Sequence, residues 1–400
     1  MRLPILFILA TVMLDAMGIG LIMPIMPDLI REVEGGSLAD AALWGGLLAT
    51  AFSVMQFLFA PVVGSLSDAV GRRPVLLVSL AVLTLDYLVM ALAGSIWLLL
   101  LGRIVGGITS ATHSTASAYM ADISEPRERA ANFGLIGAAF GVGFVLGPVI
   151  GGTLAEFGTR APFFAAAALA AANFMLGYRV MRETVTERTR RAFAWGRANP
   201  LGAFRQMAHL PGITPLMVVF FIYSVALYVY PAIWAYYTQA RFGWAPPMIG
   251  LSLAVYGISM ALVQGVLMRP VLRRLGERRT VVWGQVFDLI TFGLLAIITS
   301  GTLALILTPV TALGVMVTPA LQGIMSRRVA DDAQGELQGV LSSLHALAAI
   351  VAPLTMTGVF AAFTRPGAAI QLPGAPFVLS MALVVLGLAI FSRTRTSLPG

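Results

Sequence analysis

Long runs of apolar residues, separated by short polar stretches, set the pattern of this 400-residue chain. A helix needs about 20 apolar residues to cross a hydrocarbon core of about 30 Å, and the runs have that length. Because the membrane interior offers backbone amides no water, each run is expected to form a helix. The sequence lacks the alternating ten-residue segments of a membrane β-barrel. The expected spans are residues 4–28, 41–64, 75–94, 96–120, 131–155, 161–181, 212–238, 247–268, 280–299, 302–325, 337–361 and 374–392.

The first run has some features of a secretory signal, because Arg2 precedes apolar residues from Leu3 to Leu14. A small-residue cleavage site does not follow, and the run continues past Asp15 to Met26. We therefore interpret it as the first membrane helix.

Three of the runs carry an aspartate in their interior, namely Asp15, Asp86 and Asp288. A carboxylate at bilayer depth costs roughly 2.5 to 3.5 kcal/mol on insertion scales, so it is seldom found there without a function or a partner. One reading of each is a buried polar residue that holds two helices together. Three of them, two at related positions, favour a function in transport.

Composition adds an orientation to this picture. The chain is 58% hydrophobic and 11% charged, with a mean hydropathy of +0.88, which excludes a soluble globular domain. All 26 basic residues are arginine. With loops assigned alternately to two sides, 21 arginines fall on the side of the N-terminus, four on the other side, and Arg103 lies inside a helix. The positive-inside rule then predicts a multi-pass protein of the bacterial inner membrane with both termini in the cytoplasm.

Charge and cysteine content restrict the partners. The net charge of +8 is explained by this topology and by anionic lipid, so a nucleic-acid partner is not expected. The chain has no cysteine, which excludes disulfides and a thiolate metal site. We expect a monomer in the lipid bilayer with no metal, no cofactor and no enzymatic activity.

The longest polar segment between spans, residues 182–211, divides the spans six and six. If one half is a duplicate of the other, matching residues should lie about 200 positions apart in the sequence, and three such matches occur. Gly71 matches Gly276, Asp86 matches Asp288, and Gly147-Pro148 matches Ala352-Pro353. The prediction is an all-α membrane protein of twelve transmembrane helices in two pseudo-symmetric six-helix bundles. Their bounds are 1–181 and 212–400, joined by a cytoplasmic loop, as in alternating-access transporters.

The loop after the second span reads Gly64-Ser65-Leu66-Ser67-Asp68-Ala69-Val70-Gly71-Arg72-Arg73 and resembles the signature loop of the major facilitator superfamily. Asp68 can cap the next helix or pair with an arginine, and Gly64 and Gly71 permit close approach and turning. Arg72 and Arg73 suit the cytoplasmic headgroups. The alternative is a simple charged turn.

Two further motifs are similar to motifs of that superfamily. In the fourth span Gly102-Arg103-Ile104-Val105-Gly106-Gly107 resembles its second motif, in which a buried arginine is linked to proton transfer. The fifth span matches the antiporter motif G-x8-G-x3-G-P-x2-G-G, which exporters in the superfamily carry, at Gly134, Gly143, Gly147, Pro148, Gly151 and Gly152. Glycines four residues apart also let helices pack closely, and proline bends a helix.

Within the superfamily, the chain resembles the tetracycline/proton antiporters along nearly its whole length. The most specific stretches are residues 14–24, 71–77 with Asp86-Tyr87, 241–244, 319–323 and 334–339. The resemblance implies export of a cationic chelate of tetracycline with a divalent metal in exchange for a proton. It also implies functional membrane carboxylates at Asp15, Asp86 and Asp288, a buried Arg103, polar cavity residues Gln56 and Gln264, and cytoplasmic gating charges Asp68, Arg72 and Asp122.

The sequence departs from the family pattern in three places. Ala69 stands where an arginine is usual, and Met260 where a histidine is usual four residues before Gln264. His113, ten residues after Arg103, either handles protons in place of that histidine or packs with a satisfied hydrogen bond. The seventh span is aromatic around Pro231, which suits either a flat drug or a packing surface. The residues expected to bind substrate are Gln56, His113, Tyr228, Tyr230, Trp234, Met260, Gln264 and Gln285.

The predicted function is proton-coupled efflux of an amphipathic drug, with tetracycline the first candidate. The alternatives are export of a different drug or metabolite, and nutrient/proton symport by the same fold. An intramembrane aspartyl protease is excluded, because none of the three aspartates has a Gly-x-Gly-Asp context. Proton coupling is assigned to Asp15, Asp86, Asp288, Arg103 and His113. Gating and helix motifs are assigned to Gly64, Asp68, Gly71, Arg72, Arg73, Asp122, Gly143, Gly147, Pro148 and Gly151.

Overall fold

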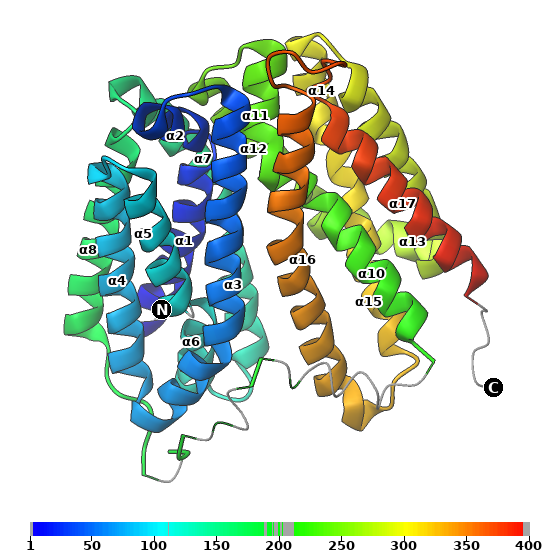
Figure 1. The fold of residues 1–400 in the computed structure, drawn as a ribbon. Helices are drawn as coiled ribbons and strands as arrows, with labels where there is room; N and C mark the ends of the chain where they lie inside the picture. The colour runs from blue at the N-terminus through cyan, green and yellow to red at the C-terminus, as the bar shows by residue number, and fades with distance from the viewer. Residues whose placement is uncertain are drawn as a thin grey trace. The chain divides into compact units, whose positions relative to one another are not determined.

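The computed structural model describes residues 3–110, 112–187, 190–193, 195, 199–200, 202 and 212–394. Within these ranges every regular element is a helix (Figure 1). The chain forms two compact units. Unit 1 comprises residues 1–35, 51–200 and 245–254, and unit 2 comprises residues 36–50, 201–244 and 255–400.

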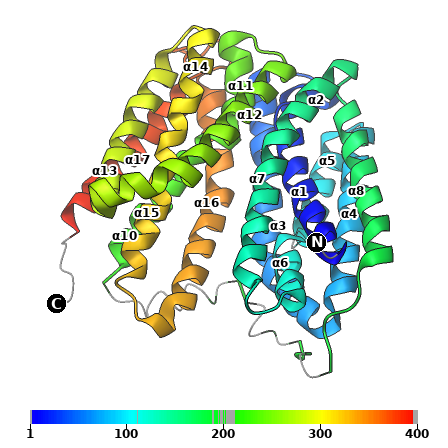
Figure 2. The ribbon, with the colours of Figure 1, turned by 180° about the vertical axis from the view of Figure 1, so that it is seen from behind.

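Unit 1 is organised around α1 (Leu3–Ile22), which packs along α7 (Arg129–Leu154) (Figure 2). A second pair, α4 (Arg72–Leu92) and α8 (Ala161–Val180), packs beside it. The other elements are α2 (Met26–Glu34), the part of α3 (Leu38–Val70) from Ala51, α5 (Ile96–Thr109), α6 (Thr112–Ile123) and η1 (Ala155–Phe157).

Unit 2 has α10 (Thr214–Leu227) against α16 (Gln334–Ala362) and α17 (Ala375–Arg393). In the same unit α13 (Met268–Ile297) packs against α17 and α15 (Val317–Ser326). The other elements are α11 (Val229–Phe242), the π turn η2 (Val263–Leu267), α14 (Gly301–Thr311), η3 (Ala312–Met316) and η4 (Asp331–Ala333). The helix α12 (Pro246–Leu262) begins in unit 1 and ends in unit 2.

Eleven helices in the described residues are long and apolar enough to cross a membrane. The longest, Pro246–Ile297, covers two of the predicted spans, 247–268 and 280–299. Gly276 interrupts it with a φ of 71°, a value that glycine adopts without a steric penalty. Counted on both sides of Gly276, the helices number twelve, so the prediction of a twelve-helix membrane fold is confirmed.

Five predicted spans are not continuous α-helices. The span 4–28 breaks after Ile22, between α1 and α2, and the span 247–268 ends in the π turn η2. The span 96–120 breaks at Ser110, between α5 and α6. The span 212–238 breaks at Tyr228, so that Pro231 falls in the first turn of α11, where its missing N–H leaves no hydrogen bond unmade. The span 302–325 contains the 3₁₀ segment η3 between α14 and α15.

The predicted loop 182–211 is described only in part. Four basic residues of this loop lie outside the described residues, namely Arg188, Arg197, Arg205 and His209, as do Arg2 and Arg395 at the ends of the chain. Unit 1 extends through Pro200, and residues 36–50 and 245–254 belong to the opposite unit from the one expected. The domain bounds at 181 and 212 remain a prediction.

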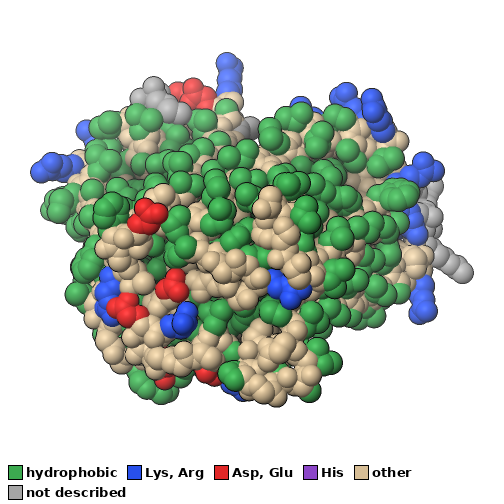
Figure 3. All heavy atoms as spheres, turned by 90° about the horizontal axis from the view of Figure 1, so that it is seen from above, with side chains coloured by type: hydrophobic (Ala, Val, Ile, Leu, Met, Phe, Trp, Pro, Cys, Tyr) green, Lys and Arg blue, Asp and Glu red, His purple; other side chains and the backbone are tan. Residues whose placement is uncertain are grey.

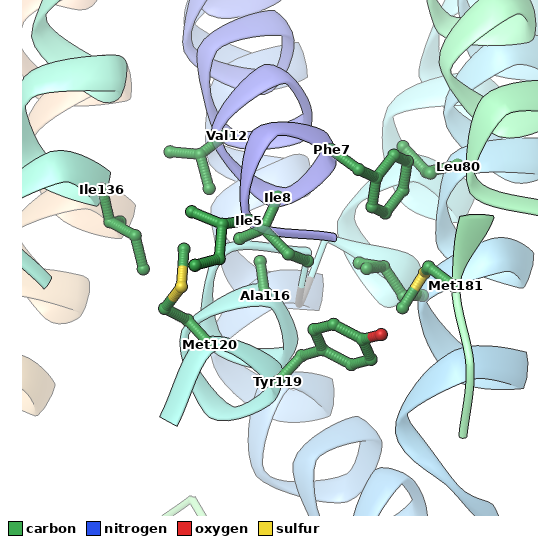
Figure 4. Close-up of a cluster of buried hydrophobic side chains, with 11 residues drawn as sticks. Ile5, Phe7, Ile8, Val12, Leu80, Ala116, Tyr119, Met120, Ile136 and Met181 are labelled. Carbon is green, nitrogen blue, oxygen red and sulfur yellow. The ribbon is translucent and has the colours of Figure 1, made fainter. Parts of the chain in front are cut away.

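A cluster of buried hydrophobic residues fixes the N-terminal half of α1 (Figure 4). Ile8 and Val12 of α1 pack with Met120 of α6 and Ile136 of α7, all less than 5% exposed. Since interiors are close-packed, these contacts set the rotation of α1 and thus the direction of Asp15.

Hydrophobic side chains are widespread on the face seen from above, between areas of backbone and other side chains, and charged side chains stand there in small groups (Figure 3). Exposed large residues such as Trp97, Trp283 and Ile297 are more than 60% exposed. A surface of this kind is typical of contact with lipid.

Candidate functional site

In unit 1, Asp86 of α4 forms an ion pair with Arg103 of α5. The side chains are 2% and 13% exposed. The guanidinium also donates to Met90 Sδ at 3.0 Å, and its Cζ lies 5.3 Å from the centre of the Phe52 ring. One cation therefore holds a carboxylate, a thioether and an aromatic face at once.

Two glycines make room for this carboxylate. A Cβ at Gly102 would lie 2.8 Å from Asp86 Oδ1, and one at Gly106 would lie 2.9 Å from Oδ2. The second-motif glycines thus let Asp86 lie directly on the backbone of α5. The sequence predicted both charged residues as functional, but it did not predict that they pair with each other.

Asp15 has a different environment. It is half-buried and lines a pocket between α1, α4 and α8, with Thr11, Tyr87 and Asn173 as the other polar lining residues. Asn173 donates to Thr11 at 3.0 Å. Among the described residues, neither an ion pair nor a hydrogen bond to the Asp15 carboxylate is found.

The antiporter glycines of α7 pack against the backbone of α1 on either side of Asp15. Gly143, Gly147 and Gly151 lie against the carbonyl groups of Met13, Met17 and Leu21, respectively. Pro148 packs on Gly20, and its own carbonyl oxygen meets Gly250 of α12 within unit 1. The close packing expected from glycines four residues apart is confirmed here, and it leaves no room for side chains between these helices. Gly134 is not part of this contact.

In unit 2, Asp288 of α13 is fully buried and has no arginine or histidine partner in the described part of the chain. Its Oδ2 is 2.6 Å from the hydroxyl oxygen of Tyr223 of α10. The same hydroxyl lies 2.8 Å from the carbonyl oxygen of Gly314 in η3. Tyr223 was not predicted as a site residue, because in the sequence it resembles the other apolar and aromatic residues of the seventh span.

The signature loop forms a charged cluster in unit 1. Arg72 pairs with Asp68 at 2.6 Å and contacts Asp122 at 3.4 Å. Of the two roles proposed for Asp68, the structure shows pairing with arginine, not capping. The backbone N–H groups of Arg72 and Arg73 donate instead to Glu183, at 2.9 and 3.2 Å. Gly71, with a φ of 129°, makes the turn between α3 and α4.

One family model, described as Major Facilitator Superfamily, matches residues 8–353. The chain belongs to the Major Facilitator Superfamily. Within it, the chain belongs to the family of the tetracycline resistance proteins. It is 45% identical to tetracycline resistance protein class C of Escherichia coli over 355 residues, which cover 89% of each chain. Class B of Escherichia coli is 36% identical, over 88% of this chain and 87% of that one.

Solved structures of superfamily members have the same fold. The human organic anion transporter MFSD10 (TETRAN) aligns with a TM-score of 0.69 and 24% identity, covering 97% of this chain and 99% of that one. A bacterial homolog to the human lysosomal transporter Spinster, in an inward-facing and unoccupied conformation, aligns with a TM-score of 0.79 and 16% identity, covering 99% and 98%.

The residues predicted to bind substrate belong to both units and differ in their exposure. Gln56 and Gln264 are exposed, and Met260 and Tyr228 are half-buried. Tyr228 lies beside the ring of His345, with centroids 5.7 Å apart. His113 lies on α6, but its side chain is outside the described residues.

The aromatic residues of α11 are mostly packed inside unit 2. Trp234 is 4% exposed, and Tyr230 contacts the rings of Trp234, Tyr256 and Phe377. Tyr230 and Trp234 therefore pack inside unit 2, and their contact with a drug stays a prediction. Gln285 is fully buried one turn before Asp288, and neither of its amide atoms has a hydrogen-bond partner among the described residues. Those residues also hold no group of three His, Asp or Glu side chains that could bind a metal ion.

Proposed function

We propose that this chain is a proton-coupled tetracycline exporter that works by alternating access. The observation that carries the proposal is 36–45% identity to six tetracycline resistance proteins along about nine-tenths of the chain. The substrate would be the drug or its cationic chelate with a divalent metal. The chain would act as a monomer in the bacterial inner membrane, with both termini in the cytoplasm and without catalytic activity or a resident cofactor. Its halves would be residues 1–181 and 212–400.

In this proposal Asp288 exchanges the proton. A carboxylate in an apolar bundle without a cation nearby is costly when charged, so it takes up a proton readily. A cationic drug in the pathway favours the ionised carboxylate, whereas protonation from the acidic outside removes that attraction. One carboxylate does not bind the cationic drug and a proton well at the same time. The drug is therefore exchanged for a proton. Where net charge moves, the membrane potential contributes about 2.3 kcal/mol per charge per 100 mV.

The two unit 1 carboxylates take other roles in the proposal. Asp86 and Arg103 neutralise each other, so protonation of Asp86 would break the ion pair and leave the Arg103 guanidinium without its counter-ion. Asp15 lies beside the α1–α7 contact that the antiporter motif forms, which links its protonation to the packing of those helices. The cluster of Asp68, Arg72 and Asp122 supplies the cytoplasmic gate.

Everted membrane vesicles test this function directly. On energisation they should accumulate radiolabelled tetracycline in the presence of Mg²⁺, and an uncoupler should abolish the accumulation. Asp288→Asn should remove energised accumulation while the protein stays in the membrane, because Asn keeps the shape but does not titrate. Uptake by right-side-out vesicles instead would indicate a symporter and contradict the proposal.

A second candidate is export of another amphipathic drug. It is favoured by Met260 and by the aromatic packing of α11, both at positions expected to contact substrate, and by 27% identity to multidrug resistance protein 2 of Bacillus subtilis over 86% of each chain. Growth inhibition by a panel of tetracyclines and unrelated antibiotics, with and without the chain, separates the two. Protection only against non-tetracyclines would select the second candidate.

A further inference from the structure

The hydroxyl of Tyr223 lies between two acceptors but carries one proton. The oxygens of Asp288 and of the Gly314 carbonyl are 2.6 and 2.8 Å from it. A phenol donates one hydrogen bond and can accept others, whereas a carbonyl oxygen only accepts. Both contacts are therefore hydrogen bonds at the same time only when the Asp288 carboxyl is protonated. It then donates to Tyr223, and Tyr223 donates to Gly314.

The ionised carboxyl changes this arrangement. A carboxylate has no proton to donate, and a hydrogen bond to a charged acceptor is stronger than one to a neutral carbonyl. The hydroxyl then turns about its bond to the ring and donates to Asp288. The Gly314 carbonyl then keeps the hydrogen bond from the backbone N–H of Val317, the residue after η3, and loses the one from Tyr223.

Gly314 lies at a break in a membrane helix. The 3₁₀ segment η3 separates α14 from α15, and 3₁₀ hydrogen bonds have poorer geometry than α-helical ones. A Cβ at position 314 would lie 2.6 Å from Asp288 Cγ, so only glycine lets the carboxyl lie this close to the backbone. Tyr223 thus connects α10 and α13 to the break between α14 and α15.

Other ionisable groups do not compete for this proton. Tyr230 of α11 and Tyr256 of α12 are close enough to be affected by the charge of Asp288, and neither donates to it in the described structure. Asp86 has Arg103 as its partner, and a guanidinium only donates. Asp288 has Tyr223 as its partner, and the Tyr223 hydroxyl can either donate to the carboxyl or accept from it.

We propose that Tyr223 is a positioning residue that transmits the protonation state of Asp288 to the break at Gly314. With Asp288 protonated, the relay Asp288 to Tyr223 to Gly314 ties α10 to η3. With Asp288 ionised, the tie to η3 is lost and the break is free to rearrange. This inference rests on the proposed role of Asp288 in proton exchange.

Tyr223→Phe removes the relay and keeps the ring. Its energised tetracycline accumulation should fall about tenfold or more, while exchange of labelled for unlabelled drug at equal pH stays within about twofold. Loss of the Tyr223 hydroxyl as a donor disfavours the ionised form of Asp288. The midpoint of the pH profile of energised accumulation should therefore move up by about one pH unit or more. The matched control is Tyr237→Phe, because the Tyr237 hydroxyl donates at 2.6 Å to the Leu295 carbonyl of the same helix α13. It should leave the midpoint in place.

Hydrogen–deuterium exchange of a peptide covering residues 312–317 tests the relay without drug transport. In the unmodified protein its amides should be less protected, relative to their intrinsic exchange rate, above the transport midpoint than below it. All rates are divided by the intrinsic rate at the same pH, because amide exchange is itself base-catalysed. On that scale the Tyr223→Phe amides should be weakly protected at both values, and in Asp288→Asn the protection should be the same at both. A Tyr223→Phe protein that keeps both the pH midpoint and the pH-dependent protection overturns the proposal. If the unmodified chain moves no tetracycline, the proposed function fails, but the exchange measurement still decides the relay.

Discussion

Gly147 of α7 lies directly on the carbonyl group of Met17 of α1, with no side chain between the two backbones. A Cβ at this position would be 3.0 Å from the Met17 Cα and closer still to its oxygen. Since backbone atoms on both sides form the contact, rotation of a side chain cannot make room.

Gly147→Ala should therefore lower the yield of folded protein and its melting temperature, because overpacking typically costs about 1–3 kcal/mol. Size-exclusion chromatography after heating measures both. Gly141→Ala on the same helix is the control, since a Cβ there meets nothing within 4 Å. Equal melting of the two variants would mean that the α1–α7 contact yields easily.

Arg103→Lys should reduce drug accumulation about tenfold or more at unchanged expression. An ammonium group lacks the planar guanidinium that holds Asp86, Met90 and the Phe52 ring together. Arg365→Lys is the control, because its pair with Asp40 is 3.4 Å long and exposed, and such pairs contribute about 0–1 kcal/mol. Normal pumping by Arg103→Lys would show that position 103 needs only a positive charge.

The topology can be tested with single cysteines in this cysteine-free chain. The loop glycines Gly36, Gly158 and Gly367 have φ between 82° and 122°, so cysteine there would be strained. Exposed neighbours serve better. Glu34→Cys, Glu156→Cys and Ala369→Cys should react with an impermeant maleimide in intact cells, and Arg190→Cys and Arg274→Cys should not. Labelling of position 190 from outside would contradict the arginine-based orientation.

Glu32 should give a small pH-dependent contribution to stability. The Thr159 hydroxyl, followed by Arg160, holds the pKa of Glu32 below its usual value. A carboxyl with a lowered pKa stabilises the fold above its unfolded pKa of about 4.3 and loses that effect as pH falls through the folded value. Glu32→Gln should thus melt slightly below the unmodified protein at pH 7, and the difference should close below about pH 4. A difference that persists in acid would point to packing as its cause.

The pattern of apolar runs predicted the helices, since a membrane leaves few other structures possible. It did not predict the breaks at Ser110, Tyr228 and Gly314, because hydropathy averages over a window and does not register a single turn of altered geometry. The two units also differ from the predicted halves at residues 36–50 and 245–254. There the N-terminal parts of α3 and α12 pack on helices that are distant in sequence.

The candidate site was predictable where a charge interrupts an apolar run. Asp15, Asp86, Arg103 and Asp288 stand out for that reason, whatever their partners. Tyr223 does not stand out, because tyrosine is common in membrane helices and its partner lies 65 residues away. Glu183 lies in a polar segment where any acidic residue looks like solvent-exposed surface, and its contact with Arg72 crosses 111 residues.

The attachment of Glu183 to the start of α4 bears on how this protein could be divided for laboratory use. The Thr184 hydroxyl donates to Asp122 at 2.8 Å, and the Arg191 N–H donates to the Asp68 carbonyl at 3.3 Å. Glu183 and Arg191 therefore bind the signature loop, and Thr184 binds Asp122 of α6. A protease site or a split point for co-expressed fragments belongs after Pro200, where the second segment of unit 1 ends, so that Glu183 and Thr184 stay on the fragment that contains their partners.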